Sequence, residues 1–200
     1  SLHGPRTAPI PSRSVSLGRS PVQVSRVIFG SLALGSARAD GTERTRTIRS
    51  ALDAGITSID TAPMYDLGAS EQAVGLALRD TSGEVQILSK VGLRWDDARG
   101  PVSFRTRDEH GQTIDVRKNS RPDSVRFDVD RSLKRLRVDV LDAVHVHVRD
   151  PLTPIAETME ALKELLREGK LRAIGVASDF GPVEIAEAQR ALGDVPLASV

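Results

Sequence analysis

Short apolar segments alternate with amphipathic helical patterns along most of the chain, and this alternation limits the fold more than any other feature. The apolar segments, which predict strands, cover residues 27–30, 56–61, 85–91, 141–148, 171–177 and 196–200. The helical patterns cover residues 42–55, 70–79, 125–136, 153–169 and 182–192. Strands that are apolar along their whole length and alternate with helices are typical of a parallel sheet covered by helices. We therefore expect an α/β fold.

Two arrangements of such a sheet are possible: a doubly wound open sheet and a (β/α)8 barrel of the TIM type. The segment Gly30-Ser31-Leu32-Ala33-Leu34-Gly35 after the first strand has two of the three glycines that a Rossmann-type dinucleotide-binding loop uses. Reactive polar residues follow the second, third and fourth strands instead. A barrel collects the carboxyl ends of all its strands on one rim, so their placement favours the barrel.

The length of the chain bears on how much of a barrel it can form. A barrel of this type takes about 250 residues, whereas the sequence has 200 and stops inside its sixth expected strand. We therefore expect five to six of the eight β/α units. Residues 15–25, with Leu17-Gly18-Arg19-Ser20-Pro21 at the turn, predict a β-hairpin ahead of the barrel. The expected organisation is a flexible tail over residues 1–14 and a single domain over residues 15–200, incomplete at its C-terminus.

The composition disfavours or excludes several classes of protein. The 28 basic and 27 acidic residues leave a formal net charge of +1, which gives no electrostatic reason to expect nucleic acid or a membrane as a partner. No apolar run approaches the roughly 20 residues that cross a bilayer. The absence of cysteine excludes disulfides, thiolate metal sites and a cysteine nucleophile, and it fits a cytoplasmic protein.

Four polar residues lie at or just after the ends of expected strands. Asp60 ends the second strand and Tyr65 follows it in the loop, while Lys90 and His147 end the third and fourth. Because parallel strands of a barrel end on one rim, we expect the four side chains to converge, as a set that can donate a proton to a carbonyl. Taken singly, each has a simpler interpretation, such as a turn-forming aspartate or a solvated lysine at a strand end.

The order of these motifs resembles the aldo-keto reductase family, and the resemblance extends through essentially the whole chain after residue 14. His147-Val148-Arg149-Asp150-Pro151 is similar to the family's His-x-Pro-Asp-Pro signature, with Arg149 in place of proline. Gly169-Lys170-Leu171-Arg172-Ala173-Ile174-Gly175-Val176 is similar to its approach to strand five. Gly92-Leu93-Arg94-Trp95-Asp96 resembles a bacterial subgroup with an extended loop after strand three.

The resemblance implies an NADPH-dependent oxidoreductase that reduces a small aldehyde or ketone to the alcohol. Tyr65 would supply the proton. A free phenol loses its proton only near pH 10, and Lys90 would be the neighbouring ammonium that favours the phenolate. Asp60 would balance the charge of Lys90. His147 would orient the carbonyl by a hydrogen bond.

Cofactor contacts are expected at two further places besides Asp60. Gly30 and Ser31 would let the cofactor or substrate approach the backbone, with an ordinary strand-ending turn as the alternative. The family's Gly-Val-Ser-Asn-Phe is replaced by Gly175-Val176-Ala177-Ser178-Asp179-Phe180, which is one residue longer and has no asparagine. Ser178, and after it Asp179, are the candidates for holding the nicotinamide carboxamide. The alternative is that they cap the next helix.

Leu32 and Trp95 are the expected lining of the substrate pocket. Trp95 lies at the start of a polar insertion of roughly thirty residues, a length that is uncommon for a loop without regular structure and often functional. A small hairpin over residues 102–116 is the alternative. His145 lies on the same strand face as His147. No third ligand at a familiar spacing accompanies them, so we expect no metal and place His145 in the barrel interior.

The cofactor and the activity each have an alternative. NADPH is the family default and NADH is not excluded, because the strands that bind the adenosine phosphate are not in this sequence. One alternative function is a cofactor-binding regulatory or redox-sensing subunit with little turnover, and another is an inactive incomplete barrel. The expected partner is a small carbonyl substrate of unspecified identity, bound by a monomer or weak homo-oligomer.

Overall fold

The computed structural model describes residues 14–32, 41–79, 81–177 and 179–200. Five strands form one parallel sheet: β3 (Ile28–Gly30), β4 (Ser58–Asp60), β5 (Gln86–Val91), β9 (Ala143–Val146) and β10 (Ile174–Val176). Along the sheet these strands lie in the same order as in the chain. A doubly wound sheet reverses this order at its centre. The sequential order therefore excludes the doubly wound alternative and confirms that the chain forms part of a barrel wall.

The residues after the last helix extend the same wall. The Ala198 N–H donates to the carbonyl of Ile174 at 2.8 Å, and the Val176 N–H donates to the carbonyl of Ser199 at 3.1 Å. A parallel bridge joins Ile174 and Leu197. The expected sixth strand over residues 196–200 is thus present as a short extended segment beside β10.

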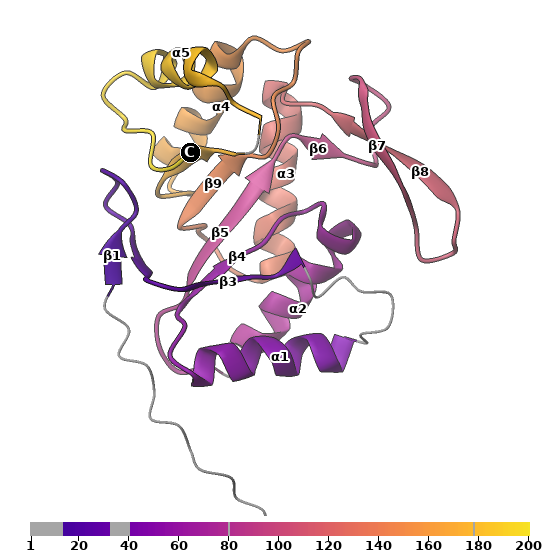
Figure 1. The fold of residues 1–200 in the computed structure, drawn as a ribbon, viewed down its shortest axis with the longest axis vertical. Coiled ribbons are helices and arrows are strands. Elements are labelled where there is room, and N and C mark those ends of the chain that lie inside the picture. The colour runs from indigo at the N-terminus through magenta and orange to yellow at the C-terminus, as the bar shows by residue number, and fades with distance from the viewer. Residues whose placement is uncertain (1–13, 33–40, 80, 178) are drawn as a thin grey trace, which may run out of the picture.

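Five helices cover the outer face of the sheet (Figure 1): α1 (Gly41–Asp53), α2 (Ala69–Leu78), α3 (Pro122–Leu136), α4 (Ile155–Arg167) and α5 (Pro182–Leu192). Each helix packs against the next along the chain. In α3, Val125 and Val129 are four residues apart and fully buried, as the sequence pattern predicts. They belong to one large core between the helices and the outward side chains of the strands, such as Ile59 and Val144.

A hairpin of β1 (Ser14–Ser16) and β2 (Gln23–Ser25) precedes the barrel, and the prediction of a hairpin here is confirmed. Val22 and Val24 pack against inward side chains of the strands in a second, smaller apolar cluster. Its remaining buried members are Leu88, Ala143, Ala173 and Ala198. The hairpin therefore covers the interior of the barrel. The expected tail over residues 1–14 lies outside the described residues, apart from Ser14.

The polar insertion after β5 forms a sheet of its own. A short strand β6 (Leu93–Arg94) pairs with β8 (Thr113–Lys118), and β8 pairs with β7 (Val102–Arg107), in antiparallel fashion. This confirms the hairpin alternative for the insertion. The hairpin projects from the body of the molecule in Figure 1.

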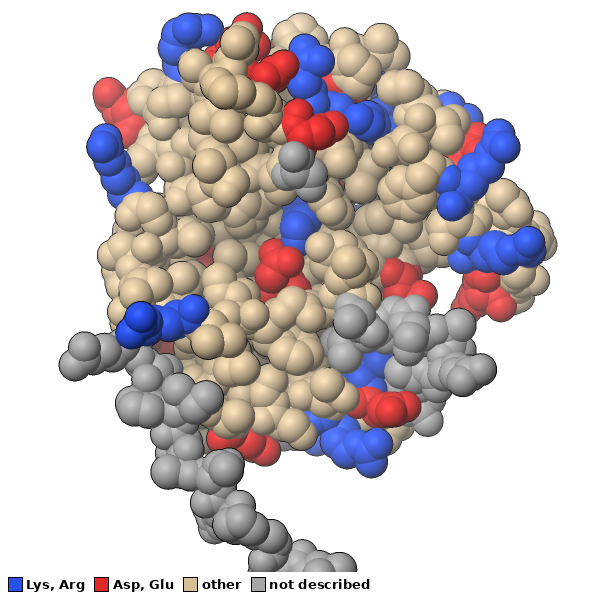
Figure 2. Space-filling view, in the orientation of Figure 1, with Lys and Arg blue, Asp and Glu red and all other residues tan. Residues whose placement is uncertain are grey.

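Acidic and basic side chains lie interspersed over the face shown in Figure 2, in keeping with the nearly balanced charge of the sequence. In the parts of the chain that the structure describes, no helix is both long and apolar enough to cross a bilayer.

Candidate active site

The centre of the site is the ammonium of Lys90, the fifth residue of β5. Its Nζ donates to both carboxylate oxygens of Asp60, at 2.8 and 2.7 Å, and to the carbonyl of Thr61 at 2.9 Å. The Lys90 side chain is 9% exposed and that of Asp60 32% exposed. An ammonium so far removed from water needs a counter-charge and acceptors, and these three bonds provide both.

Tyr65 begins a short 3-10 turn, η2 (Tyr65–Gly68), in the loop after β4. The Lys90 Nζ lies 4.9 Å from the centroid of the Tyr65 ring. The rings of Tyr65 and His147 meet edge to face, with centroids 5.9 Å apart and an interplanar angle of 79°. The structure therefore brings Asp60, Tyr65, Lys90 and His147 together at the carboxyl end of the sheet, and the predicted convergence is confirmed.

His147 follows the end of β9, where its N–H donates to the carbonyl of Val91 at 2.9 Å. Burial, and after it the positive charge of Lys90, lower the pKa of His147 to about 4, although Asp60 acts in the opposite direction. The imidazole is therefore neutral near pH 7, and in that state one of its ring nitrogens is a donor.

Three buried hydroxyls support the loop that carries Tyr65. The Ser70 hydroxyl donates to the Ser31 Oγ at 2.8 Å and lies 3.3 Å from the Thr61 Oγ1. The Ser31 hydroxyl in turn donates to the carbonyl of Asp60 at 2.9 Å. Ser31 is fully buried, so its hydroxyl serves this network, and an approach of the cofactor or substrate to the backbone at Gly30 and Ser31 stays a prediction. No sequence pattern pointed to this role of Ser70, which lies five residues after Tyr65 at the start of the following helix.

The segment after His147 is fixed by two carboxylates. Asp150 is buried and accepts from the N–H groups of Ser120 and Leu152 and from the Thr153 hydroxyl. Asp150 belongs to the motif from His147 to Pro151, and the motif alone did not predict this structural role.

Asp179 is the second of these carboxylates. It accepts from the Arg149 N–H at 2.6 Å and from the Lys118 Nζ at 3.1 Å, which joins the end of β10 to the inserted hairpin. The N-cap residue of α5 is Gly181, and among the described residues no side chain makes a capping hydrogen bond to this helix. Asp179 is therefore not the helix cap that was one of its two interpretations. Ser178 lies outside the described residues.

His145 lies in the barrel interior, as expected, beside Lys90 in the strand register. Its Nε2 is 2.5 Å from the Ser199 Oγ. Burial and the charge of Lys90 lower the pKa of His145, so it too is neutral near pH 7. Among the described residues, no group of three His, Cys, Asp or Glu side chains has a metal-binding arrangement.

The remaining candidates differ in their surroundings. Gly30 is exposed, and a Cβ built there would lie within 4 Å of no atom of the described residues. The Leu32 side chain is 64% exposed. Trp95 is half-buried, and its ring centroid lies 5.6 Å from the guanidinium carbon of Arg135, which pairs with the buried Glu71. Gly30 and Leu32 thus lie on open surface, whereas Trp95 packs towards α3.

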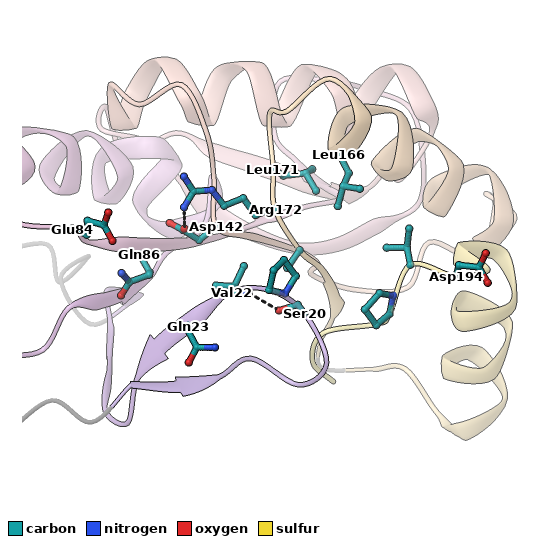
Figure 3. A pocket seen from close by; sticks show the side chains of 14 residues that line it. Ser20, Val22, Gln23, Glu84, Gln86, Asp142, Leu166, Leu171, Arg172 and Asp194 are labelled. Carbon is teal, nitrogen blue, oxygen red and sulfur yellow. Dashed lines mark hydrogen bonds and ion pairs between the residues drawn. The ribbon is translucent and has the colours of Figure 1, made fainter.

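A cavity of about 610 Å³ lies at the opposite end of the strands (Figure 3). It is bordered by Ser20, Val22 and Gln23 of the hairpin and by Asp142, which pairs with Arg172 just before β10. In TIM barrels the chemistry occurs at the carboxyl end of the strands, and the amino end serves stability. The cavity is therefore separate from the site around Lys90.

Comparisons with known proteins match most of the chain to one family. The sequence profile of the Aldo/keto reductase family matches residues 26–200. Aldo-keto reductase YhdN of Bacillus subtilis is 39% identical over 168 residues, which cover 82% of this chain and 46% of that protein. The NADH-specific methylglyoxal reductase of Escherichia coli is 34% identical over 201 residues, which cover 91% of this chain and 60% of that protein.

Among solved structures, the glycerol dehydrogenase from Gluconobacter oxydans matches with a TM-score of 0.77 and 35% identity. The match covers 94% of this chain and 54% of that one. The chain thus spans about half the length of the relatives it matches.

Proposed function

This chain belongs to the aldo/keto reductase family, and from that premise we propose that the complete protein reduces a small aldehyde or ketone to the alcohol with a nicotinamide cofactor. The observation that carries the proposal is the set of contacts around Lys90. Its ammonium is bonded to Asp60 and lies over the ring of Tyr65, which meets His147 edge to face. This arrangement suits the delivery of a proton to a carbonyl oxygen.

The described residues fit the nicotinamide end of such a cofactor. No described residue comes within 4 Å of a Cβ built at Gly30, which leaves room for a flat group above the end of β3. The partly exposed carboxylate of Asp60 lies at the end of the neighbouring strand. We propose that Gly30 and Asp60 line the nicotinamide and that Leu32 and Trp95 contribute to the substrate pocket. Asp179 stays a candidate for the carboxamide contact, and it would share its carboxylate with Arg149 and Lys118.

The bound cofactor supplies the hydride that adds to the carbonyl carbon. In our proposal Tyr65 donates its hydroxyl proton to the carbonyl oxygen. The ammonium of Lys90 stabilises the negative charge that then remains on the phenol oxygen. Asp60 holds the ammonium in place. His147, neutral at working pH, donates an N–H to the carbonyl oxygen and favours the growth of negative charge on it.

We propose NADPH as the preferred cofactor and a reactive aromatic aldehyde or a dicarbonyl as the substrate. Two relatives support a test with a wider panel, because one is named as an NADH-specific methylglyoxal reductase and another as a glycerol dehydrogenase. The experiment measures oxidation of NADPH and of NADH by the complete protein with aromatic aldehydes, dicarbonyls and simple ketones. We expect turnover with NADPH. Cofactor binding without turnover of any carbonyl would contradict the proposal and favour a cofactor-binding sensor.

A further inference from the structure

The residues directly after Tyr65 adopt an unusual backbone conformation. Asp66 has φ 52° and ψ 43°, and Leu67 has φ 51° and ψ 39°. Both lie in the left-handed helical region, where the Cβ of an L-residue comes too close to the backbone. Apart from glycines, the only other described residue with a positive φ is Arg137. Two adjacent residues in this conformation persist only where their surroundings hold them.

The far end of this turn is held by packing. Gly68 also has a positive φ, of 95°, and a Cβ built there would lie 2.7 Å from the Arg135 Nε. Two residues later, the Ser70 hydroxyl donates to Ser31. The close approach of Arg135 to Gly68 and the hydrogen bond of Ser70 restrict the end of the turn. Neither of them involves Asp66.

The contact that reaches Asp66 comes from α1. The guanidinium of Arg44, in the first turn of that helix, forms an ion pair with the Asp66 carboxylate. The Arg44 side chain is 11% exposed and that of Asp66 36% exposed. The Arg44 Nε is buried and donates to no acceptor in the described part of the chain. The pair therefore joins a largely buried cation to the residue that follows Tyr65.

We propose that Arg44 and Asp66 are positioning residues for Tyr65. Their ion pair holds Asp66 in its left-handed conformation, and that conformation sets the direction in which the preceding residue presents its phenol to Lys90 and His147. Aspartate suits the position, because it tolerates the left-handed region better than most residues with a side chain. This inference rests on the proposed function, in which Tyr65 supplies the proton.

The test compares Asp66→Asn, Arg44→Gln and the double variant with the wild type. Asparagine keeps the shape of the side chain and its tolerance of the left-handed region, and it removes the charge. We expect each single variant to lower kcat by about 10- to 100-fold, the range that a misplaced catalytic group can cost. KM and the Kd for NADPH should change less than about threefold, since neither residue is proposed to touch a ligand. The double variant should lose no more than either single one, because the same contact is removed.

Two further variants separate positioning from general damage. Arg44→Lys retains the charge and should recover part of kcat. Glu160→Gln breaks the ion pairs of Glu160 with Lys163 and Arg167 on α4, away from the site, and should leave kcat unchanged. Thermal unfolding of every variant shows whether the fold is intact. If the intact Asp66→Asn and Arg44→Gln variants keep kcat within twofold of wild type, the proposal is overturned.

A readout that needs no turnover keeps this inference distinct from the proposed function. Nuclear magnetic resonance of protein with labelled tyrosine rings reports the surroundings of Tyr65, whose signal is identified by its loss in Tyr65→Phe. We expect Asp66→Asn and Arg44→Gln to shift the Tyr65 ring signal and Glu160→Gln to leave it in place. Signals that superimpose on those of the wild type would refute the positioning role, even if the wild type reduced no carbonyl at all.

Discussion

Lys90 and Asp60 form an ion pair between neighbouring strands, in which the ammonium donates to both carboxylate oxygens, although the two residues are not partners in the strand register. The register partner of Asp60 is Leu88, and Lys90 is two residues further along β5. Side chains two apart lie on the same strand face, so the lysine reaches back across the barrel interior to both carboxylate oxygens. The pair links the second and third strands of the wall as well as serving the site.

The energetic coupling of this pair is measurable by a double-mutant cycle. Lys90→Met should lower the free energy of unfolding by roughly 1–3 kcal/mol, below the 3–5 kcal/mol typical of a broken buried pair because Asp60 keeps some contact with water. Asp60→Asn in the Lys90→Met background should cost less than in the wild type. Urea denaturation of the four proteins gives the coupling energy. Additivity within about 0.3 kcal/mol would mean that the two residues do not interact.

Tyr65→Phe removes the proposed acid and keeps the ring that packs against His147. We expect turnover to fall by a factor of about 10² to 10⁴, the usual contribution of a general acid, and cofactor affinity to stay near that of wild type. Steady-state rates and a cofactor titration measure the two quantities separately. Turnover at the wild-type rate would show that another group delivers the proton.

His147 should make the stability of the protein depend on pH. Its ordinary pKa of 6.5 falls to about 4 in the folded state. Between these values the unfolded chain takes up a proton that the folded protein does not, so stability falls as the pH is lowered from 6.5 towards 4. The loss amounts to roughly 3 kcal/mol at most.

His147→Gln cannot take up that proton, so its free energy of unfolding should fall less over the same range. His145, whose pKa is also lowered, is present in both proteins and gives a contribution of the same sign in each. Urea denaturation from pH 4 to pH 8 provides the measurement. If the free energy of unfolding fell equally with pH in the wild type and in His147→Gln, a lowered pKa of His147 would be contradicted.

Gly175 should tolerate no side chain. It is the register partner of His145, and a Cβ there would lie 2.4 Å from the His145 Cδ2 and 2.7 Å from the Ser199 Oγ. Gly175→Ala should destabilise the protein by roughly 1–3 kcal/mol, as overpacking of a filled interior does.

A second substitution identifies the cause of that destabilisation. His145→Ala removes the ring that the new methyl group would strike, so Gly175→Ala should cost less in this background than in the wild type. Equal costs in the two backgrounds would place the strain elsewhere in β10. Thermal or urea unfolding of the four proteins decides between these outcomes.

The sequence by itself determined the alternation of strands and helices and predicted the members of the central cluster. Apolar strand segments alternating with helices specify a parallel arrangement, and parallel strands of a barrel end on one rim. Asp60, Lys90 and His147 could therefore be placed together from their positions at strand ends, with Tyr65 in the loop beside them. These inferences depend on local periodicity and on connectivity, which a sequence contains.

Only the tertiary structure decided how the surroundings act on these residues. The neutral state of His147 depends on its burial and on the charge of Lys90. The burial of Ser31 and the close fit of His145 over Gly175 depend on side chains from several strands. The left-handed turn at Asp66 depends on a loop conformation and on Arg44, 22 positions earlier in the chain. Such effects arise from distances between segments that are remote in the chain, and no local pattern of residues specifies those distances.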